Sequence, residues 1–125
     1  MSIKAAVEAL NSSQERIENM KKEFEKRRDY IVSRINSIPR ITCRKPEGAF
    51  YVFPNVKELL GKTFKGKAIN TDLKLTDYPL NQAKIAVVPG TAFGTEGYIR
   101  ISYATSIENI KSGMDRLEDS LKLFR

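Results

Sequence analysis

Apolar residues recur at intervals of three, four and seven positions in the early part of the chain. The pattern begins after Ser12 and continues to about Ser37, where Pro39 ends it because proline cannot continue a regular helix. The apolar positions are Ile17, Met20, Phe24, Ile31, Ile35 and Ile38. This spacing predicts a long amphipathic helix, with Ser12 and Glu15 as a capping box at its start. A shorter helical segment is predicted over residues 3–10.

The long helix is long enough to extend beyond a single small domain. At ~1.5 Å per residue it extends more than about 30 Å, close to the width of a small domain. Helices of this length often connect two bodies, so we expect part of it to lack a partner within this chain.

A second amphipathic helix is predicted at the end of the chain. Thr105 and Glu108 fit a capping box at its start. Its apolar positions are Ile107, Ile110, Met114, Leu117, Leu121 and Phe124. Such a stripe could form a coiled coil, but a helix of this length that ends a mixed domain more often packs on a sheet.

The middle of the chain has the shorter patterns of strands. Residues 41–44, 49–53 and 85–88 are apolar runs, and residues 98–104 alternate strictly between two faces. Residues 56–60 suggest one helical turn. Residues 71–84 have helical periodicity, with a break or kink expected near Tyr78 because Pro79 follows it. Together these elements predict an α+β fold, a two-layer sandwich of helices on a small sheet with a long N-terminal linking helix.

Composition adds mainly exclusions. The 125 residues, 41% hydrophobic and 30% charged, suit one globular domain. The chain contains no histidine, which removes the commonest general base, Ser-His and Cys-His pairs and histidine metal sites, so no metal and no catalytic residue are predicted. The single Cys43 cannot form an internal disulfide, and no signal peptide or membrane span is apparent, which favours a cytoplasmic location.

The net charge of +7 raises the possibility of nucleic-acid binding. The basic residues of the long helix, however, alternate with acidic ones such as Glu18, Glu23 and Asp29. Mixed signs on one helix usually form a solvated face with local ion pairs, whereas nucleic-acid surfaces have a cleaner basic stripe. The sequence therefore predicts neither a nucleic-acid nor a membrane partner.

Two glycine patterns resemble nucleotide-binding motifs only in part. Gly61-Lys62-Thr63 lacks the earlier glycine of a P-loop, because position 56 is Val56, and no buried strand leads into it. A turn after a short helix is the better interpretation. Gly90, Gly94 and Gly97 lack the spacing of a dinucleotide fingerprint and are more typical of a tightly turning loop.

Arg100 is the residue whose position carries the most information. It lies in the middle of the alternating segment GYIRISYA, residues 97–104, between two isoleucines that should face the core. Its guanidinium should therefore point from the opposite face of a rigid strand, where its planar fork matches a carboxylate. Alternatively, Arg100 is a surface arginine or an ion-pair partner of Glu96 or Glu47. The residues alone favour neither interpretation.

Three longer motifs resemble a known family. They are PEGAFYVFP at residues 46–54, AVVPGTAFG at residues 86–94, and GYIRISYA at residues 97–104. In this order and spacing they resemble the C-terminal portion of class I/II (fold type I) pyridoxal-phosphate aminotransferases, in particular the prokaryotic aspartate aminotransferase branch. The segment from Met20 to Tyr30 resembles the helix that joins the large and small domains of that family.

The resemblance implies roles for two residues. Arg100 falls on the arginine that binds the α-carboxylate of the amino-acid or 2-oxo-acid substrate, and Phe93 lies in a loop that shields the site. It implies a transaminase that acts on aspartate or a related amino acid with 2-oxoglutarate. It also implies the domain division 1–12, a remnant of a large-domain helix, and 13–125, the small domain.

The family's cofactor-binding residues are not found here. No Ser-Lys motif with its Schiff-base lysine occurs in the sequence. Within the resemblance, pyridoxal 5'-phosphate and that lysine belong to the large domain of the same protein, which forms a homodimer when intact. We therefore expect no cofactor-binding residue in these 125 residues and no transaminase activity from them alone.

Other functions are compatible with the same residues. The chain could be a stand-alone α+β binding or regulatory module derived from this fold. It could also belong to an enzyme of the same cofactor superfamily with different chemistry, such as a decarboxylating acyltransferase, which shares the arginine. The sequence does not identify the amino-acid donor.

Overall fold

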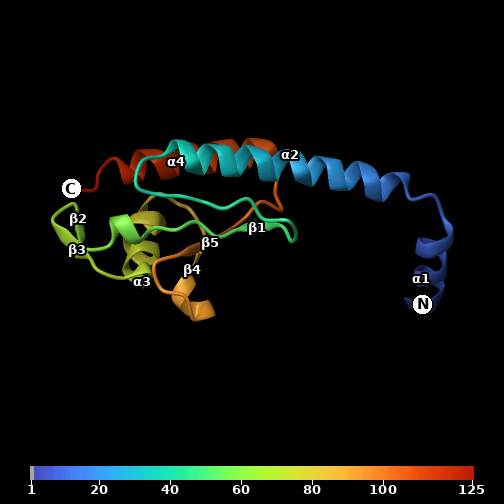
Figure 1. Cartoon of the computed structure of the whole chain (residues 1–125), viewed down its shortest axis with the longest axis horizontal. Helices are drawn as coiled ribbons and strands as arrows, with labels where there is room; N and C mark the ends of the chain where they lie inside the picture. The colour runs from blue at the N-terminus through green and yellow to red at the C-terminus, as the bar shows by residue number, and fades with distance from the viewer. Residues whose placement is uncertain (1) are drawn as a thin grey trace.

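The structure is a computed structural model that describes residues 2–125. Two helices, α2 (Glu15–Ser37) and α4 (Ile107–Leu121), lie side by side and form one layer (Figure 1). Arg34 of α2 connects them through its Nη2 atom, which lies 2.8 Å from Asp115 and 3.1 Å from Glu118 of α4. The predicted helices are confirmed, and the mixed architecture agrees with the predicted α+β class.

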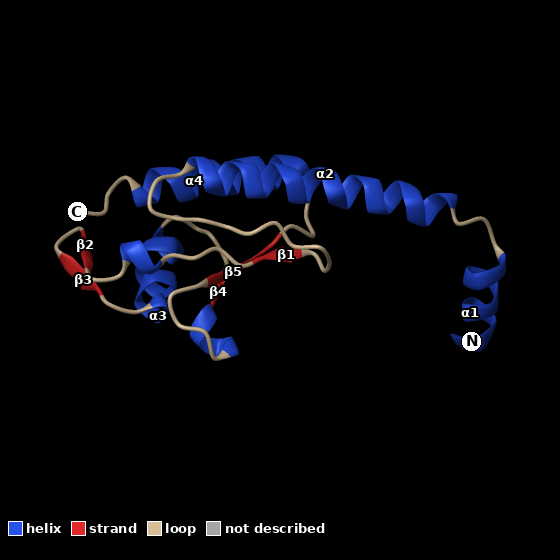
Figure 2. Ribbon diagram, in the orientation of Figure 1, coloured by secondary structure: helices blue, strands red, loops and turns tan. Residues whose placement is uncertain are grey.

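A small antiparallel sheet forms the second layer beneath these helices (Figure 2). Its strands are β1 (Tyr51–Val52), β5 (Ile99–Ser102) and β4 (Val88–Pro89), in the order β1-β5-β4. Tyr51 pairs with Ser102 and Val88 with Arg100. In this central position the backbone of β5 is hydrogen-bonded to a strand on each side, so residues on this strand are held rigidly.

The core lies between the sheet and the helices. Ile31 and Ile35 of α2, Ile99 of β5 and Met114 and Leu117 of α4 are almost completely buried. Apolar burial of this kind contributes about 25 cal/mol per Å² and accounts for the α2–α4 stripe facing the sheet. Tyr103 extends the core, and its hydroxyl donates a hydrogen bond to the Ala49 carbonyl over 2.8 Å.

The segment between β1 and β4 contains a hairpin that the sequence pattern did not predict. After a 3-10 turn, η1 (Lys57–Leu59), strands β2 (Lys62–Phe64) and β3 (Lys67–Ile69) pair through the turn Lys65-Gly66. Both turn residues have positive φ, 48° and 80°, which is typical of a two-residue hairpin loop. The predicted turn around residues 56–60 is confirmed, as is the turn interpretation of Gly61.

The helix predicted over residues 71–84 is irregular near Tyr78, as the presence of Pro79 predicted. A short helix, α3 (Asp72–Leu75), passes into a π-helical turn, η2 (Thr76–Leu80), that contains Pro79. Proline has no N–H to donate, and the wider turn accommodates the lost hydrogen bond. The last short element of the segment is a 3-10 turn, η3 (Gly90–Phe93), directly after β4.

Both predicted capping boxes are wrong in detail. At the start of α2 the N-cap is Gln14, which makes no side-chain cap bond; Ser13 rather than Ser12 accepts the Glu15 N–H, over 3.3 Å. At the start of α4 the cap is Ser106, not Thr105. The Thr105 carbonyl instead accepts a hydrogen bond from Arg27, which fixes this residue outside the helix.

All four predicted strands are also shorter than the sequence patterns suggested, and β1 and β5 span two residues of 49–53 and four residues of 98–104. Residues 41–44 form only an isolated bridge between Thr42 and Asn55. The reason is Asn36, whose side chain donates to the Cys43 carbonyl and accepts its N–H, at 3.0 and 2.8 Å, in place of a neighbouring strand. Residues 85–88 are half-buried or exposed rather than buried, and only Val88 of that run is in a strand.

The N-terminal part of the molecule extends away from this core. Helix α1 (Ser2–Asn11) has no buried residue, and residues 11–22 are exposed throughout. Ile17 and Met20 of the α2 stripe remain 48% and 56% exposed. As expected from its length, the first part of α2 therefore has no partner within residues 2–125.

Candidate functional site

Arg100 projects from the face of the sheet opposite the helices. Its neighbours Ile99 and Ile101 are 1% and 6% exposed, whereas Arg100 is half-buried. The predicted alternation of β5 is confirmed, because two inward side chains flank one outward side chain. Since β5 is the central strand, the guanidinium is attached to a rigid part of the fold.

The immediate neighbours of the guanidinium are aromatic rings. Its central carbon lies 4.5 Å from the ring centre of Phe93 and 5.2 Å from that of Tyr51. A cation over the negative face of a ring is stabilised electrostatically, by about 0.5–1 kcal/mol at exposed sites. The two rings therefore restrain the side chain.

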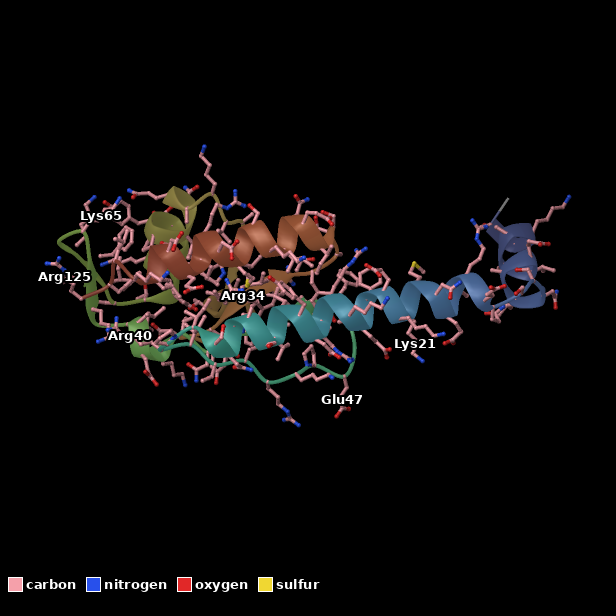
Figure 3. The ribbon with its side chains drawn as sticks, turned by 90° about the horizontal axis from the view of Figure 1, so that it is seen from above. Lys21, Arg34, Arg40, Glu47, Lys65 and Arg125 are labelled. Carbon is pink, nitrogen blue, oxygen red and sulfur yellow. The ribbon has the colours of Figure 1, made fainter. Side chains whose placement is uncertain are left out.

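None of the ion pairs found within residues 2–125 involves Arg100. The alternative that it pairs with Glu47 or Glu96 is therefore not realised in the structure. Both glutamates are exposed, and Glu47 extends outward from the loop that follows α2 (Figure 3). Arg34, in contrast, lies between α2 and α4 against its two carboxylates.

Phe93 reaches Arg100 because η3 follows β4 without a linker. Gly90 starts η3 in a tight space, where an added Cβ would overlap the Thr95 carbonyl and lie 2.9 Å from the Tyr98 Cβ. Gly94 ends it with φ of 73°, a left-handed conformation that favours glycine. The glycines of this loop thus allow a close turn, as their spacing predicted.

A second group of rings continues from Phe93 along the same face. Phe53 stacks on Tyr98 with ring centres 5.1 Å apart and contacts Phe93 edge-on at 6.3 Å. An open hollow of about 630 Å³ lies beside these rings, lined by Tyr51, Phe53, Tyr98 and residues 44–49. The arrangement provides a cation at the edge of an aromatic surface that is open to a ligand.

One contributor to this site was not predicted from the sequence. Asp72 of α3 is completely buried, and both of its carboxylate oxygens accept hydrogen bonds from Thr91 of η3. The only local signal was Thr71-Asp72 at a helix start, where Thr71 is the N-cap. Sequence periodicity could not show that Asp72 faces a loop 19 residues away.

The single cysteine, Cys43, is buried in the core. Burial raises the pKa of the Cys43 thiol and outweighs the opposing effect of a backbone hydrogen bond from Phe53. The thiol is therefore protonated at neutral pH and a poor nucleophile. Residues 2–125 contain no group of three His, Cys, Asp or Glu side chains arranged for a metal ion. Nor does any described helix combine the length and apolarity needed to cross a membrane.

Comparison with known families agrees with this arrangement. Residues 2–117 match the family described as aminotransferase class I and II. The chain belongs to this family, and Arg100, Phe93 and the η3 loop all lie within the matched residues.

Individual relatives support the predicted branch. A probable aspartate/prephenate aminotransferase from Rickettsia bellii is 49% identical over 115 residues, which cover 91% of this chain and 29% of the relative. An aspartate aminotransferase from Streptomyces avermitilis is 42% identical, with 93% of this chain and 28% of the relative covered.

Solved structures give the same result at the level of the fold. The crystal structure of the Rhizobium meliloti aspartate aminotransferase superposes with a TM-score of 0.93 at 41% identity, covering 97% of this chain and 30% of that chain. An aromatic aminotransferase from Pyrococcus horikoshii gives 0.80 at 39% identity, covering 94% and 30%. The chain thus spans under a third of the length of the relatives it matches.

Proposed function

We propose that this chain is the small domain of a pyridoxal-phosphate aminotransferase and that Arg100 binds the substrate α-carboxylate. The observation that supports this most strongly is a guanidinium on the central strand that contacts two rings and forms no ion pair within residues 2–125. A planar guanidinium with available N–H groups can bind a carboxylate through two parallel hydrogen bonds.

Each residue around Arg100 has a distinct part in this proposal. Tyr51 and Phe93 restrain the guanidinium through their rings, and its N–H groups bind the ligand carboxylate. Phe93, which is 48% exposed, shields the bound carboxylate from water. Exclusion of water lowers the local dielectric and strengthens the pairing of the two charges. The effect is to orient an amino acid or 2-oxo acid by its α-carboxylate.

The family implies pyridoxal 5'-phosphate, but the residues around Arg100 do not fit that group. The site offers one guanidinium between two rings, whereas the cofactor needs a phosphate-binding segment and a lysine for its Schiff base. We assign those groups to the large domain of the same protein. The 125 residues alone would then bind substrate weakly and catalyse no transamination.

The exposed N-terminal helices fit a contact with that large domain. Residues 1–12 would be the end of a large-domain helix and residues 13–125 the small domain. Ile3, Leu10 and Met20, which are 81%, 82% and 56% exposed, would be covered in the whole protein, which would be a homodimer. The names of the relatives, aspartate/prephenate and aspartate aminotransferase, favour aspartate or a related amino acid as donor. The acceptor in this proposal is 2-oxoglutarate, which the family resemblance implies.

A chimeric enzyme tests the proposal. This chain replaces the matching 30% of the Rhizobium meliloti aspartate aminotransferase, to which it is 41% identical. We expect the chimera to transaminate aspartate and Arg100→Lys to lower kcat/KM, because an ammonium cannot reproduce the bidentate contact. The matched control is Arg116→Lys, an exposed arginine of α4 in the helix layer. A folded chimera without activity would favour a binding module instead, and equal effects of the two substitutions in an active chimera would contradict the role proposed for Arg100.

A further inference from the structure

Asp72 is unusual among the charged residues of this fold. Within residues 2–125 the buried polar side chains are Asp72 and Ser120, and Asp72 is 0% exposed. Burial of a carboxylate is unfavourable unless its oxygens are hydrogen-bonded. The partners of Asp72 therefore indicate what the residue does.

Both partners of the Asp72 side chain come from one residue. Its Oδ2 atom accepts the Thr91 backbone N–H over 2.8 Å, and its Oδ1 atom accepts the Thr91 hydroxyl over 2.6 Å. Two bonds to one residue fix both the position and the orientation of Thr91. Asp72 itself is held at the first turn of α3, where Thr71 accepts the Lys74 N–H over 3.2 Å.

Thr91 lies at the start of the turn that carries Phe93. The turn η3 contains only Gly90–Phe93, so Thr91 lies two residues before the ring. The Gly90 N–H also holds the start of this turn, through a 2.7 Å hydrogen bond to the Tyr98 carbonyl. The ring centre is 4.5 Å from the Arg100 guanidinium. Phe93 is 48% exposed and gains little restraint from packing, apart from its edge contact with Phe53 at 6.3 Å.

We propose that Asp72 is a positioning residue, which acts through Thr91 to hold the Phe93 ring over Arg100 and so presents the guanidinium to a carboxylate ligand. The kinetic consequence rests on the proposed function, whereas the positioning can be measured without it. Asp72 itself does not touch the ligand.

The chemistry of the pair selects the informative substitutions. Thr91→Val keeps the shape of the side chain but removes the hydroxyl, which leaves one Asp72 oxygen buried without a donor. Thr91→Ser keeps the hydroxyl. Asp72→Asn also keeps both bonds, because its amide oxygen can accept the N–H while its NH₂ donates to the hydroxyl oxygen. Thr95→Val is the matched control, an exposed threonine of the same loop.

Nuclear magnetic resonance of the 125-residue chain tests the positioning. The ring current of Phe93 should displace the side-chain resonances of Arg100 in the wild type. We expect Thr91→Val to abolish much of that displacement, while Thr91→Ser, Asp72→Asn and Thr95→Val retain it. Thr91→Ala, which adds no bulk, replaces Thr91→Val if the latter does not fold. A folded Thr91→Val or Thr91→Ala chain with unchanged Arg100 resonances would overturn the proposal.

Kinetics of the chimera separate positioning from simple loss of folded protein. We expect Thr91→Val to raise KM for both the amino acid and the 2-oxo acid, on the order of tenfold, because small displacements of a binding group are costly. Thr91→Ser should restore the wild-type KM. A lower apparent kcat with unchanged KM would indicate fewer active molecules and overturn the kinetic part. An inactive chimera with shifted Arg100 resonances would count against the proposed function and not against the positioning.

Discussion

At the scale of single residues, Arg100 and Arg34 have different surroundings, and this difference is why we propose a ligand for Arg100 and a structural role for Arg34. Arg34 shows the structural case, with a carboxylate 2.8 Å away and another at 3.1 Å. Arg100 is also half-buried, but it contacts two rings and forms none of the ion pairs found within residues 2–125. A half-buried cation without an anion is partly desolvated and gains more from a carboxylate ligand than an exposed one would.

Gly90 allows a residue-scale prediction about the same loop. Its missing Cβ leaves space for the Thr95 carbonyl and for Tyr98, 2.9 Å from where that Cβ would lie. We expect Gly90→Ala to lower the free energy of unfolding by about 1–3 kcal/mol, because the overlap involves backbone atoms. The matched control is Gly113→Ala in α4, where nothing lies within 4 Å of the added Cβ.

Gly113→Ala should instead raise the free energy of unfolding by up to about 1 kcal/mol, because alanine favours a helix interior. Chemical denaturation of both variants measures the two changes. Equal effects, or a more stable Gly90→Ala chain, would contradict the packing described around η3.

At the scale of elements, the α2–α4 layer is held together by core packing and by charged pairs. Glu118 of α4 accepts contacts from Lys122 at 3.2 Å and from Arg34 of α2 at 3.1 Å. Hydrogen bonds lower the pKa of the Glu118 carboxyl below its usual value, and the bond from Lys122 has a larger effect than the bond from Arg34. The contact therefore depends on pH.

The direction of that dependence follows from the lowered pKa. A carboxyl whose pKa is lower in the folded state contributes its full stabilisation above the unfolded pKa, about 4.3, and loses it as the pH falls through the folded pKa. We expect the unfolding free energy to fall on acidification below about pH 4.3, and Glu118→Gln to weaken this fall. Glu8→Gln, on exposed α1, is the control, and an equal change in both variants would refute the assignment.

The elements also show why sequence patterns predicted some features and missed others. The helices and β5 were predictable because each has a periodic apolar face that packs on one core. The prediction of a strand over residues 41–44 was wrong because the side chain of Asn36 bonds both the N–H and the carbonyl of Cys43. The hairpin around Lys65-Gly66 had a turn signal but little apolar alternation, with Phe64 and Ile69 its buried residues.

In the candidate site, too, some features were predicted from the sequence and others were not. The outward direction of Arg100 follows from strand alternation, and its role was implied by family resemblance. Its contacts with Phe93 and Tyr51, and the Asp72–Thr91 pair, join segments distant in sequence. Such contacts depend on the tertiary fold, and a local pattern carries no information about them.

At the scale of the whole molecule, the exposed apolar stripe is the feature that a compact domain would not retain alone. Ile17 and Met20 continue the stripe of α2 but are 48% and 56% exposed. Their replacement by lysine should change the unfolding free energy of this chain by no more than about 0.5 kcal/mol, as for other surface positions.

The same Ile17→Lys and Met20→Lys substitutions should destabilise the chimera, where we propose that the stripe packs on the large domain. Buried apolar side chains contribute about 1.5–3 kcal/mol each, so a clear loss of thermal stability is expected. Thermal unfolding of both proteins measures the difference. Equal tolerance in the chain and the chimera would show that the stripe is not an interface.

The claim that Arg100 binds the α-carboxylate can be tested by removing the guanidinium from the enzyme and the α-carboxylate from the substrate, separately and together. In the chimera, kcat/KM is measured for two substrates: aspartate, and the amine obtained from aspartate when hydrogen replaces its α-carboxylate. Both substrates are tested with the Arg100 enzyme and with the Arg100→Ala variant. Removing one member of a desolvated charge pair costs about 2–5 kcal/mol. We predict that Arg100→Ala lowers kcat/KM for aspartate on the order of 10²- to 10³-fold and leaves that for the amine nearly unchanged. An equal loss for both substrates would contradict the assignment of Arg100.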